Sequence, residues 1–352
     1  MRALALAGLC AAALAAVGAT PGAQRSPRPT VLAIETLTTT SSALERLDAV
    51  TLRRVSKRFQ LWHNVGPYLG RSPDGLLAFS AQESATVHLI GQRPFRLRGS
   101  VALGSGSAAA VLWPSRRLLL VLRTAATETE LAQVDPVTRK VLARRAVDGE
   151  AIAVAAGAER IAFLLAPPGQ VGPLRLGVAG LDGTIRTVPL PLRGGSAPDL
   201  GGTIVRPGLA VDPSGTRAAA GLPEGPLVEI DLRTLRAVPH PLALRRLGRR
   251  EKGGDELIAH AAWTGNTIAL AGSSAVGTID ESGAENTVGT PTGLVLVDTR
   301  TWSARRGEDD VSEIVQAGDR VVATGETWTS NSLSGNVATG AGLSIYGDGG
   351  RV

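Results

Sequence analysis

The stretch Gly208-Leu-Ala-Val-Asp212-Pro-Ser-Gly215-Thr-Arg-Ala-Ala-Ala-Gly221, followed by Leu227-Val-Glu-Ile-Asp231-Leu-Arg-Thr-Leu-Arg236, decides the fold of this 352-residue chain. Apolar and small residues flank Asp212-Pro-Ser-Gly215, which predicts two short strands joined by a tight turn, because Pro suits its second position and Gly its left-handed one. The second stretch predicts a third strand that ends near Asp231 and a basic fourth strand. We therefore expect a unit of four short antiparallel strands within roughly 40 to 50 residues.

The same unit recurs along the chain. Copies of its third strand occupy residues 43–52, 130–138, 226–234 and 293–301, with weaker copies at 86–91, 174–179 and 342–347. A repeat of this length with four strands is typical of a β-propeller blade. The sequence therefore predicts an all-β fold, a seven-bladed β-propeller of four-stranded antiparallel blades.

The first halves of the repeat are one fewer than the second halves. They occupy residues 68–75, 111–115, 154–158, 210–214, 262–266 and 315–319. The chain enters the repeat at a second strand, 31–35, and ends just after a third strand. Closed propellers often complete one blade with strands from both termini. We therefore expect a chain truncated at its C-terminus and an incomplete ring, whose terminal blade has three strands between Val31 and about Gln60.

At Asp212-Pro-Ser-Gly-Thr and the following Val-Glu-Ile-Asp-Leu-Arg-Thr-Leu, the chain resembles the YVTN-type propeller repeats of the lactonase-like and surface-layer families. Their pattern runs strand, Asp-Pro-Asp-Gly turn, strand, then Val-x-Val-Ile-Asp-x-x-Thr. The resemblance extends from about Thr30 to the end of the chain, although Ala-Ala-Ala-Gly stands where the family has Tyr-Val-Thr-Asn. It implies the fold and leaves function open, since such propellers include enzymes, binders and scaffolds.

The N-terminus reads as a secretory leader. Met1-Arg2, an apolar run up to Val17 and the small residues to Ala19 predict a signal peptide over 1–19, and the run is too short to span a membrane. Residues 20–29 are a linker with three prolines, and 30–352 form the propeller. Cys10 is the single cysteine, and Leu9 before it disfavours lipidation. We expect a secreted, extracytoplasmic protein without disulfides or a transmembrane span.

The formal charge is +6, and all but three of the 37 basic residues are arginines. One face of the ring carries the turns between the first and second strands and between the third and fourth strands of each blade, and we name it the turn face. It collects many of the arginines, and others follow the outer fourth strands. These residues are Arg53, Arg54, Arg58, Arg116, Arg117, Arg139, Arg144, Arg145, Arg160, Arg217, Arg233, Arg300, Arg305 and Arg320. Charges on outermost strands discourage edge-to-edge pairing. The alternative is a basic surface in peripheral contact with an anionic surface, such as lipid headgroups or a wall polymer.

The opposite face carries hydroxyl- and acid-rich loops, which include residues 273–292 and 324–341. Loops on a rigid scaffold are where propellers place function. The candidate binding residues are Asp280, Glu281, Glu285, Glu326, Trp328 and Asn331. The two loops occupy equivalent positions on consecutive blades, so we expect them side by side with one acidic patch. Such a patch favours a cationic or polyhydroxylated partner.

Polar residues also mark the start of each first strand, beside the central channel. They are His63 or Asn64, Ser107, Glu150, Arg206, Asp255 or Glu256, and Asp310 or Ser312. This ring suits solvated residues at a water-filled channel, a hydrated Ca²⁺, or a sugar or lactone. His63, His88, His240 and His260 follow no metal-ligand spacing, and the sequence has no nucleotide-binding, EF-hand or nucleophile-elbow motif.

Two functions remain open. The first is a non-catalytic binding or scaffold module that presents the acid- and hydroxyl-rich loops to a protein or cell-envelope polymer, with no resident cofactor. The second is a lactonase- or lyase-like enzyme that uses His63, His260, Glu150, Glu256 and Arg206 as acid, base and oxyanion stabiliser. A catalytic site requires a histidine and a carboxylate within hydrogen-bond reach. Nucleic-acid binding is disfavoured, because aromatic residues are only 3% of the chain.

Overall fold

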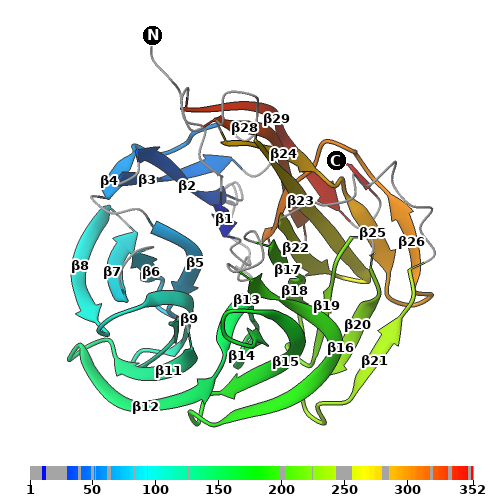
Figure 1. Cartoon of the computed structure of the whole chain (residues 1–352). Coiled ribbons are helices and arrows are strands. Elements are labelled where there is room, and N and C mark those ends of the chain that lie inside the picture. Colours follow the sequence, from blue (N-terminus) through cyan, green and yellow to red (C-terminus); the bar gives the residue numbers. More distant parts are fainter. Residues whose placement is uncertain are drawn as a thin grey trace, which may run out of the picture.

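The strands form sheets arranged around a central channel, with β1, β5, β9, β13 and β22 innermost (Figure 1). The computed structural model describes residues 10–12, 30–38, 41–48, 51, 53–61, 65–81, 85–92, 94–125, 127–197, 203–223, 225–242, 256–279, 285–317, 320–331, 335–347 and 350–351. No helix occurs in these residues, so none of them forms a membrane-spanning helix. The fold is the all-β propeller that the repeat predicts.

Four of the five sheets hold four antiparallel strands each. The first contains β1 (Cys10–Ala12), β2 (Thr30–Thr38), β3 (Ser41–Asp48) and β4 (Phe59–Leu61). The second contains β5 (Val65–Arg71), β6 (Leu77–Ala81), β7 (Thr86–Gln92) and β8 (Phe95–Ala102). The third contains β9 (Ser107–Ser115), β10 (Leu118–Thr124), β11 (Glu128–Asp135) and β12 (Lys140–Asp148). Another contains β18 (Gly208–Val211), β19 (Arg217–Gly221), β20 (Leu227–Asp231) and β21 (Ala237–His240).

The fifth sheet has fourteen strands and contains three antiparallel runs of four. The first run is β13 (Glu150–Ala156), β14 (Arg160–Ala166), β15 (Val171–Gly180) and β16 (Ile185–Ala197). The second is β22 (Glu256–Thr264), β23 (Thr267–Ile279), β25 (Val295–Asp298) and β26 (Ser303–Arg306). The third is β27 (Glu313–Ala317), β28 (Arg320–Asn331), β29 (Gly335–Gly347) and β30 (Gly350–Arg351). The remaining strands, β17 (Thr203–Arg206) and β24 (Glu285–Pro291), join the runs.

The expectation of seven separate blades is therefore wrong, because the structure has five hydrogen-bonded sheets. The cause is pairing between repeats. β17 pairs with β16 and, in parallel, with β22, while β24 pairs with β23 and β28. β17 and β24 therefore join the three four-stranded runs into one sheet.

The expected open edges at the termini are also corrected. The first sheet has four strands instead of three, since β1 pairs with β2 in the register Cys10 to Ile34. β30 supplies a short fourth strand beside β29. β1 also packs beside β27 and β5, so it completes the inner ring. It lies within the predicted leader, and removal of residues 1–19 would expose the inner edge of β2.

The Asp212–Gly215 turn is confirmed. The Gly215 amide donates to the Asp212 carbonyl at 2.9 Å, and Gly215 has a φ of 69°. The carboxylate of Asp212 accepts the backbone amides of Thr216 and Arg217, at 2.8 and 2.9 Å. The side chain thus replaces the backbone partners that a tight turn lacks.

The aspartates that end the third strands have a repeated structural role. Asp135, Asp231 and Asp298 each accept the backbone amide two residues further on, at 2.8 to 2.9 Å. Hydrogen bonds to the ionised carboxylates lower the pKa of all three. Four residues after each aspartate the chain takes a left-handed conformation, at Arg139, Leu235 and Trp302. The repeat therefore encodes one turn shape, although no glycine occupies its left-handed position.

Apolar clusters lie between consecutive four-stranded units. Leu32 and Ile34 of the first sheet pack with Leu77 and Phe79 of the second. Five further clusters join each unit to the next along the chain, ending with one between β22–β26 and β27–β30. Since each unit packs against its neighbours, the core is distributed around the ring instead of gathered at one centre.

Candidate functional site

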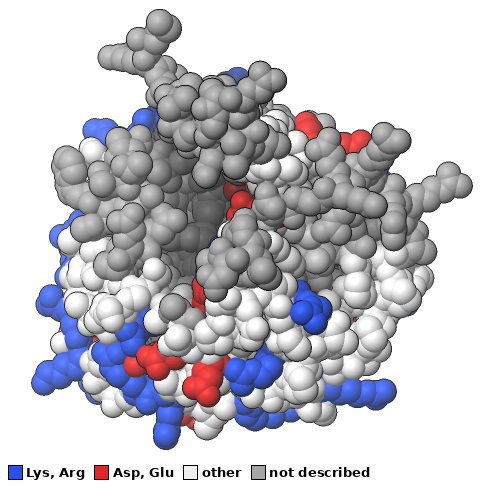
Figure 2. Space-filling model, viewed as in Figure 1, with Lys and Arg blue, Asp and Glu red and all other residues white. Residues whose placement is uncertain are grey.

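Three glutamates lie at one mouth of the channel. Glu150, Glu256 and Glu313 are the first residues of the inner strands β13, β22 and β27. The first strand of every antiparallel run begins on the same face of the ring, so these residues share that mouth. Figure 2 shows acidic atoms in the hollow at the centre of the ring.

The other residues predicted at this mouth divide into two groups. Ser107 begins β9, while Asp310 and Ser312 precede β27, as expected. His63, Asn64 and Asp255 lie outside the described residues. Glu313 was not predicted. The apolar Ile314-Val315 that follows it is the sequence signal for a strand beginning there.

The parallel pair of β17 and β22 brings Arg206 beside the inner strand. Arg206 is aligned with Ile258, so both lie on the same face of the pair as Glu256 and His260. Ala262, on the same face of β22, packs against Val311 and Ile314 of the last run. That face is therefore turned toward β27.

Gly208, two residues after Arg206, allows this arrangement. A Cβ at Gly208 would lie 2.7 Å from the carbonyl carbon of His260, a backbone atom that cannot swing aside. β18 therefore passes β22 at a separation that only glycine permits.

The channel groups differ from the outer charges in their partners. Away from the channel, Glu45 pairs with Arg54, Glu130 with Arg144 and Glu229 with Arg217. In the described part of the chain, no hydrogen bond or ion pair is made by the side chains of Glu150, Arg206, Glu256, His260 and Glu313, and Nε of Arg206 is buried.

Burial shifts two of the channel groups toward their neutral forms. It lowers the pKa of His260 from 6.5, so that the imidazole is neutral at pH 7. It raises the pKa of Glu313 above 4.5. This part of the channel thus combines a neutral imidazole, a permanent cation and carboxylates.

Glu313→Gln is expected to make stability less dependent on pH. Between 4.5 and the raised folded pKa, the folded chain keeps a proton that the unfolded chain has lost, so the free energy of unfolding falls as pH rises through that interval. Glutamine has no proton to lose. Urea unfolding at about pH 4 and pH 7 should show a smaller fall for Glu313→Gln than for wild type, while the exposed Glu159→Gln, the control, should follow wild type. Equal falls in all three would contradict the burial of Glu313.

The spacing along β22 does not assemble a catalytic pair. Glu256 and His260 are four residues apart, which corresponds to about 13 Å at the rise of a strand. Direct proton transfer between them is therefore excluded. Within the described ranges, no three His, Cys, Asp or Glu side chains are grouped closely enough to hold a metal ion, so nothing there supports the Ca²⁺ expectation.

A second surface lies on the same face of the ring, beside the channel mouth. We name it the platform: the consecutive paired strands β16, β17, β22, β23, β24, β28 and β29. The two predicted loops are strands within it. Residues 286–289 of β24 pair with residues 328–331 of β28, which confirms that the two segments lie side by side.

The register of β24 and β28 separates the predicted acidic residues. Gly289 is aligned with Trp328, and Asn286 with Asn331. Continuation of that register places Glu285 and Glu326 six residues apart along the pair, or about 20 Å. Asp280 and Glu281 lie outside the described residues. Two of the four predicted acidic residues thus lie apart along the pair, and the single acidic patch stays a prediction.

Where β24 lies between β23 and β28, the described side chains of the platform are uncharged. Cross-strand pairs place Ser274 with Thr290, Val276 with Val288, and Val288 with Thr329 on one face. We name these residues, together with Thr327, the hydroxyl patch. Val288, Thr290, Thr327 and Thr329 are exposed. The alternation of Thr327 and Thr329 was the signal for this surface, and the prediction of a loop concealed it.

Many arginines of the turn face and the outer strands hold neighbouring units together. Arg46 donates to the Gln92 carbonyl at 3.1 Å, and Arg144 to the Leu103 carbonyl at 3.0 Å. Arg160 reaches the Gly215 carbonyl, and Arg186 the carbonyls of Leu232 and Arg233. The sequence suggested edge protection or docking on an anionic surface as roles for these arginines. The structure adds a third role, because these guanidinium groups connect one unit to the next.

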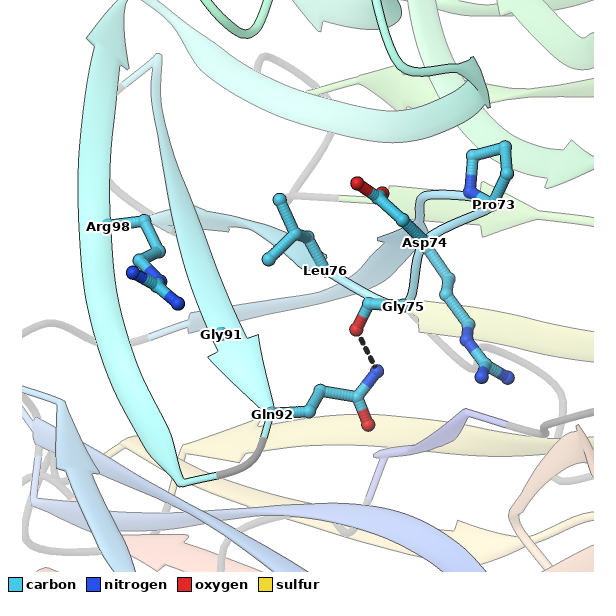
Figure 3. A pocket seen from close by; sticks show the side chains of 8 residues that line it. Pro73, Asp74, Gly75, Leu76, Gly91, Gln92 and Arg98 are labelled. Carbon is cyan, nitrogen blue, oxygen red and sulfur yellow. Dashed lines mark hydrogen bonds between the residues drawn. The ribbon is translucent and has the colours of Figure 1, made fainter.

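A hollow of about 400 Å³ lies on the turn face of the second sheet. Arg71, Asp74, Gly75, Gln92 and Arg98 contribute to its lining (Figure 3). Nε2 of Gln92 donates to the Gly75 carbonyl at 2.5 Å, and Oε1 of the same residue accepts from Arg46. Since these polar groups secure the contact between sheets, we assign the hollow a structural role.

Comparison with known proteins supports the fold. No protein family model and no curated protein matches the chain. Among solved structures, the β-propeller domain of Myceliophteria thermophila Cps50 (Swd1) is 11% identical, with 84% of this chain and 90% of that chain covered and a TM-score of 0.54. BamB from Moraxella catarrhalis is 12% identical over 91% and 92% of the two chains, with a TM-score of 0.49. Kuenenia stuttgartiensis hydrazine synthase is 11% identical over 73% of each, with a TM-score of 0.49. The resemblance to YVTN-type repeats stays a prediction from sequence.

Proposed function

We propose that this chain is a secreted, non-catalytic interaction or scaffold propeller that binds a partner through the hydroxyl patch of the platform. The observation that carries it is the pairing of β24 with β28, which converts two irregular segments into a continuous surface.

The chemistry of the hydroxyl patch indicates the kind of partner. Its described members carry no charge, and exposed threonines alternate with valine across adjacent strands. Neutral hydroxyl groups donate and accept hydrogen bonds, while the methyl groups of Val288, Thr327 and Thr329 supply apolar contact. Such a surface fits a neutral, polar protein segment or a polyhydroxylated polymer and replaces the cationic partner inferred from an acidic patch.

Site-specific photo-crosslinking tests the proposal. A photoreactive amino acid at Thr329 is expected to give a discrete covalent adduct in the organism's envelope fraction. The matched control is the exposed Thr234, in the turn between β20 and β21 on the opposite face. An adduct from Thr234 and none from Thr329 would place the binding surface elsewhere.

The lactonase- or lyase-like alternative has its own test. The purified chain is expected to leave a panel of lactones unchanged, because Glu256 and His260 are too far apart to act as a direct acid–base pair. Turnover that disappears in His260→Gln and persists in the control His240→Gln would replace the scaffold proposal with a catalytic one.

A further inference from the structure

Exposed apolar side chains concentrate on one side of the ring. Leu97 on β8 is 53% exposed, Leu142 on β12 is 60% exposed, and Val137 in the turn before β12 is 66% exposed. Of the described residues, only Val55 and Val288 are further large hydrophobic residues with comparable exposure. Three of these five exposed hydrophobic residues therefore belong to two neighbouring outer strands and the turn before one of them.

The same strands are basic, and their only acidic residue is Asp148, the last residue of β12. Neither residues 95–102 nor residues 137–147 include an aspartate or glutamate. Their basic residues are Arg96, Arg98, Arg139, Lys140, Arg144 and Arg145. Arg96, Arg98, Lys140 and Arg145 are exposed and make no hydrogen bond or ion pair with the described part of the chain. We name β8, β12 and the turn before β12 the basic flank.

The basic flank is one continuous surface. Nη1 of Arg139, in the turn before β12 of the third sheet, lies close to Gly99 on β8. It is 3.0 Å from the point that a Cβ atom at Gly99 would occupy. Arg144 of β12 donates to the Leu103 carbonyl, just after β8, at 3.0 Å. Figure 2 shows Lys and Arg atoms along the left and lower-left margin of the ring, where Figure 1 places β8 and β12.

We propose that the basic flank docks on the surface of an anionic lipid bilayer. Charge repulsion at a sheet edge needs only the arginines and lysine, and exposed Leu97 and Leu142 would work against it. A soluble polyanion would likewise leave Leu97, Val137 and Leu142 in water. Anionic headgroups satisfy the cations, and the acyl boundary beneath them accepts the aliphatic side chains. The contact is peripheral and lies apart from the hydroxyl patch, so it does not depend on partner binding there.

Vesicle flotation with the full chain tests the proposal. The protein is expected to float with phosphatidylcholine vesicles that contain about a third phosphatidylglycerol, and not with phosphatidylcholine alone. The triple variant Arg96→Ser, Lys140→Ser, Arg145→Ser should bind the anionic vesicles roughly 100-fold more weakly, since each cation contributes about fivefold at a membrane surface. The control Arg233→Ser, Arg236→Ser, Arg305→Ser removes three exposed charges elsewhere on the ring and should bind as wild type does.

The aliphatic contribution separates a bilayer from a soluble polyanion. Leu97→Ser with Leu142→Ser should weaken vesicle binding further at high salt, where charge attraction is screened. It should leave the affinity for heparin, used as a soluble polyanion, unchanged. If the leucine variant binds vesicles like wild type, or the two triple variants lose equal affinity, the proposal is wrong. Circular dichroism of each variant confirms that the fold is intact.

Discussion

Gly325→Ala is expected to destabilise the protein by more than about 3 kcal/mol. A Cβ at Gly325 would overlap the backbone carbonyl oxygen of Asp310. The amide of Ser312 donates to the Thr324 carbonyl at 3.0 Å and holds the two segments together. The pairing of β28 with β29 shifts register between Thr324 and Glu326. Gly325 therefore occupies an irregularity in β28, where the backbone comes into contact with the segment around Asp310.

The matched control is Gly225→Ala. A Cβ there would have its nearest neighbour, Cβ of Leu222, at 3.5 Å, an ordinary contact distance. Its free energy of unfolding in urea should stay within about 1 kcal/mol of wild type. Similar midpoints for both alanine variants would show that Asp310 and Gly325 do not approach one another as closely as described.

The repeat was readable because its strands and turns are local. The turn at Asp212–Gly215 is determined by proline, glycine and a carboxylate within a few residues, and the structure confirms it. The aspartates Asp135, Asp231 and Asp298 marked the ends of third strands for the same reason. Local hydrogen bonds leave a signature in the sequence, and a repeated signature predicts the fold.

The platform could not be predicted in this way. Segments 273–292 and 324–341 contain few of the large apolar residues that identify a strand. In addition, β24 and β28 belong to two different repeats, and each pairs with the other instead of only with strands of its own repeat. The parallel pairing of β17 with β22 also bypasses the whole β18–β21 sheet. Pairing partners so distant in sequence leave no local pattern, and this explains why five sheets stand where seven blades were expected.

The candidate site was predicted in part. Topology alone placed Glu150 and Glu256 at the channel mouth, since first strands begin on one face of a propeller. The burial of His260 and Glu313 depends on packing that no spacing reveals. The acidic patch was inferred from composition, whereas strand register decides which residues are neighbours, and it separates Glu285 from Glu326.

Phe163→Ala is expected to cost about 3 to 5 kcal/mol, the usual cost of removing a buried aromatic ring. Phe163 has no exposed surface and packs between the third sheet and the β13–β16 run, with Leu120, Leu122 and Leu131. Alanine at this position leaves a cavity that strands fixed by cross-strand hydrogen bonds cannot close. The exposed Leu142→Ala is the control and should change urea stability by less than about 1 kcal/mol.

Gly177→Ala tests whether the aromatic ring of Phe163 fits between the strands because residue 177 has no side chain. Phe163 is aligned with Gly177 across β14 and β15, and its ring occupies the space that a Cβ at Gly177 would enter. Gly177→Ala alone should destabilise by about 1 to 3 kcal/mol through overpacking. In Phe163→Ala the space is empty, so the added methyl group is harmless or fills part of the cavity. The double variant should therefore be more stable than the sum of the single effects by at least about 1 kcal/mol. Additive losses would show that the ring lies elsewhere, and the packing between these two units would have to be reassigned.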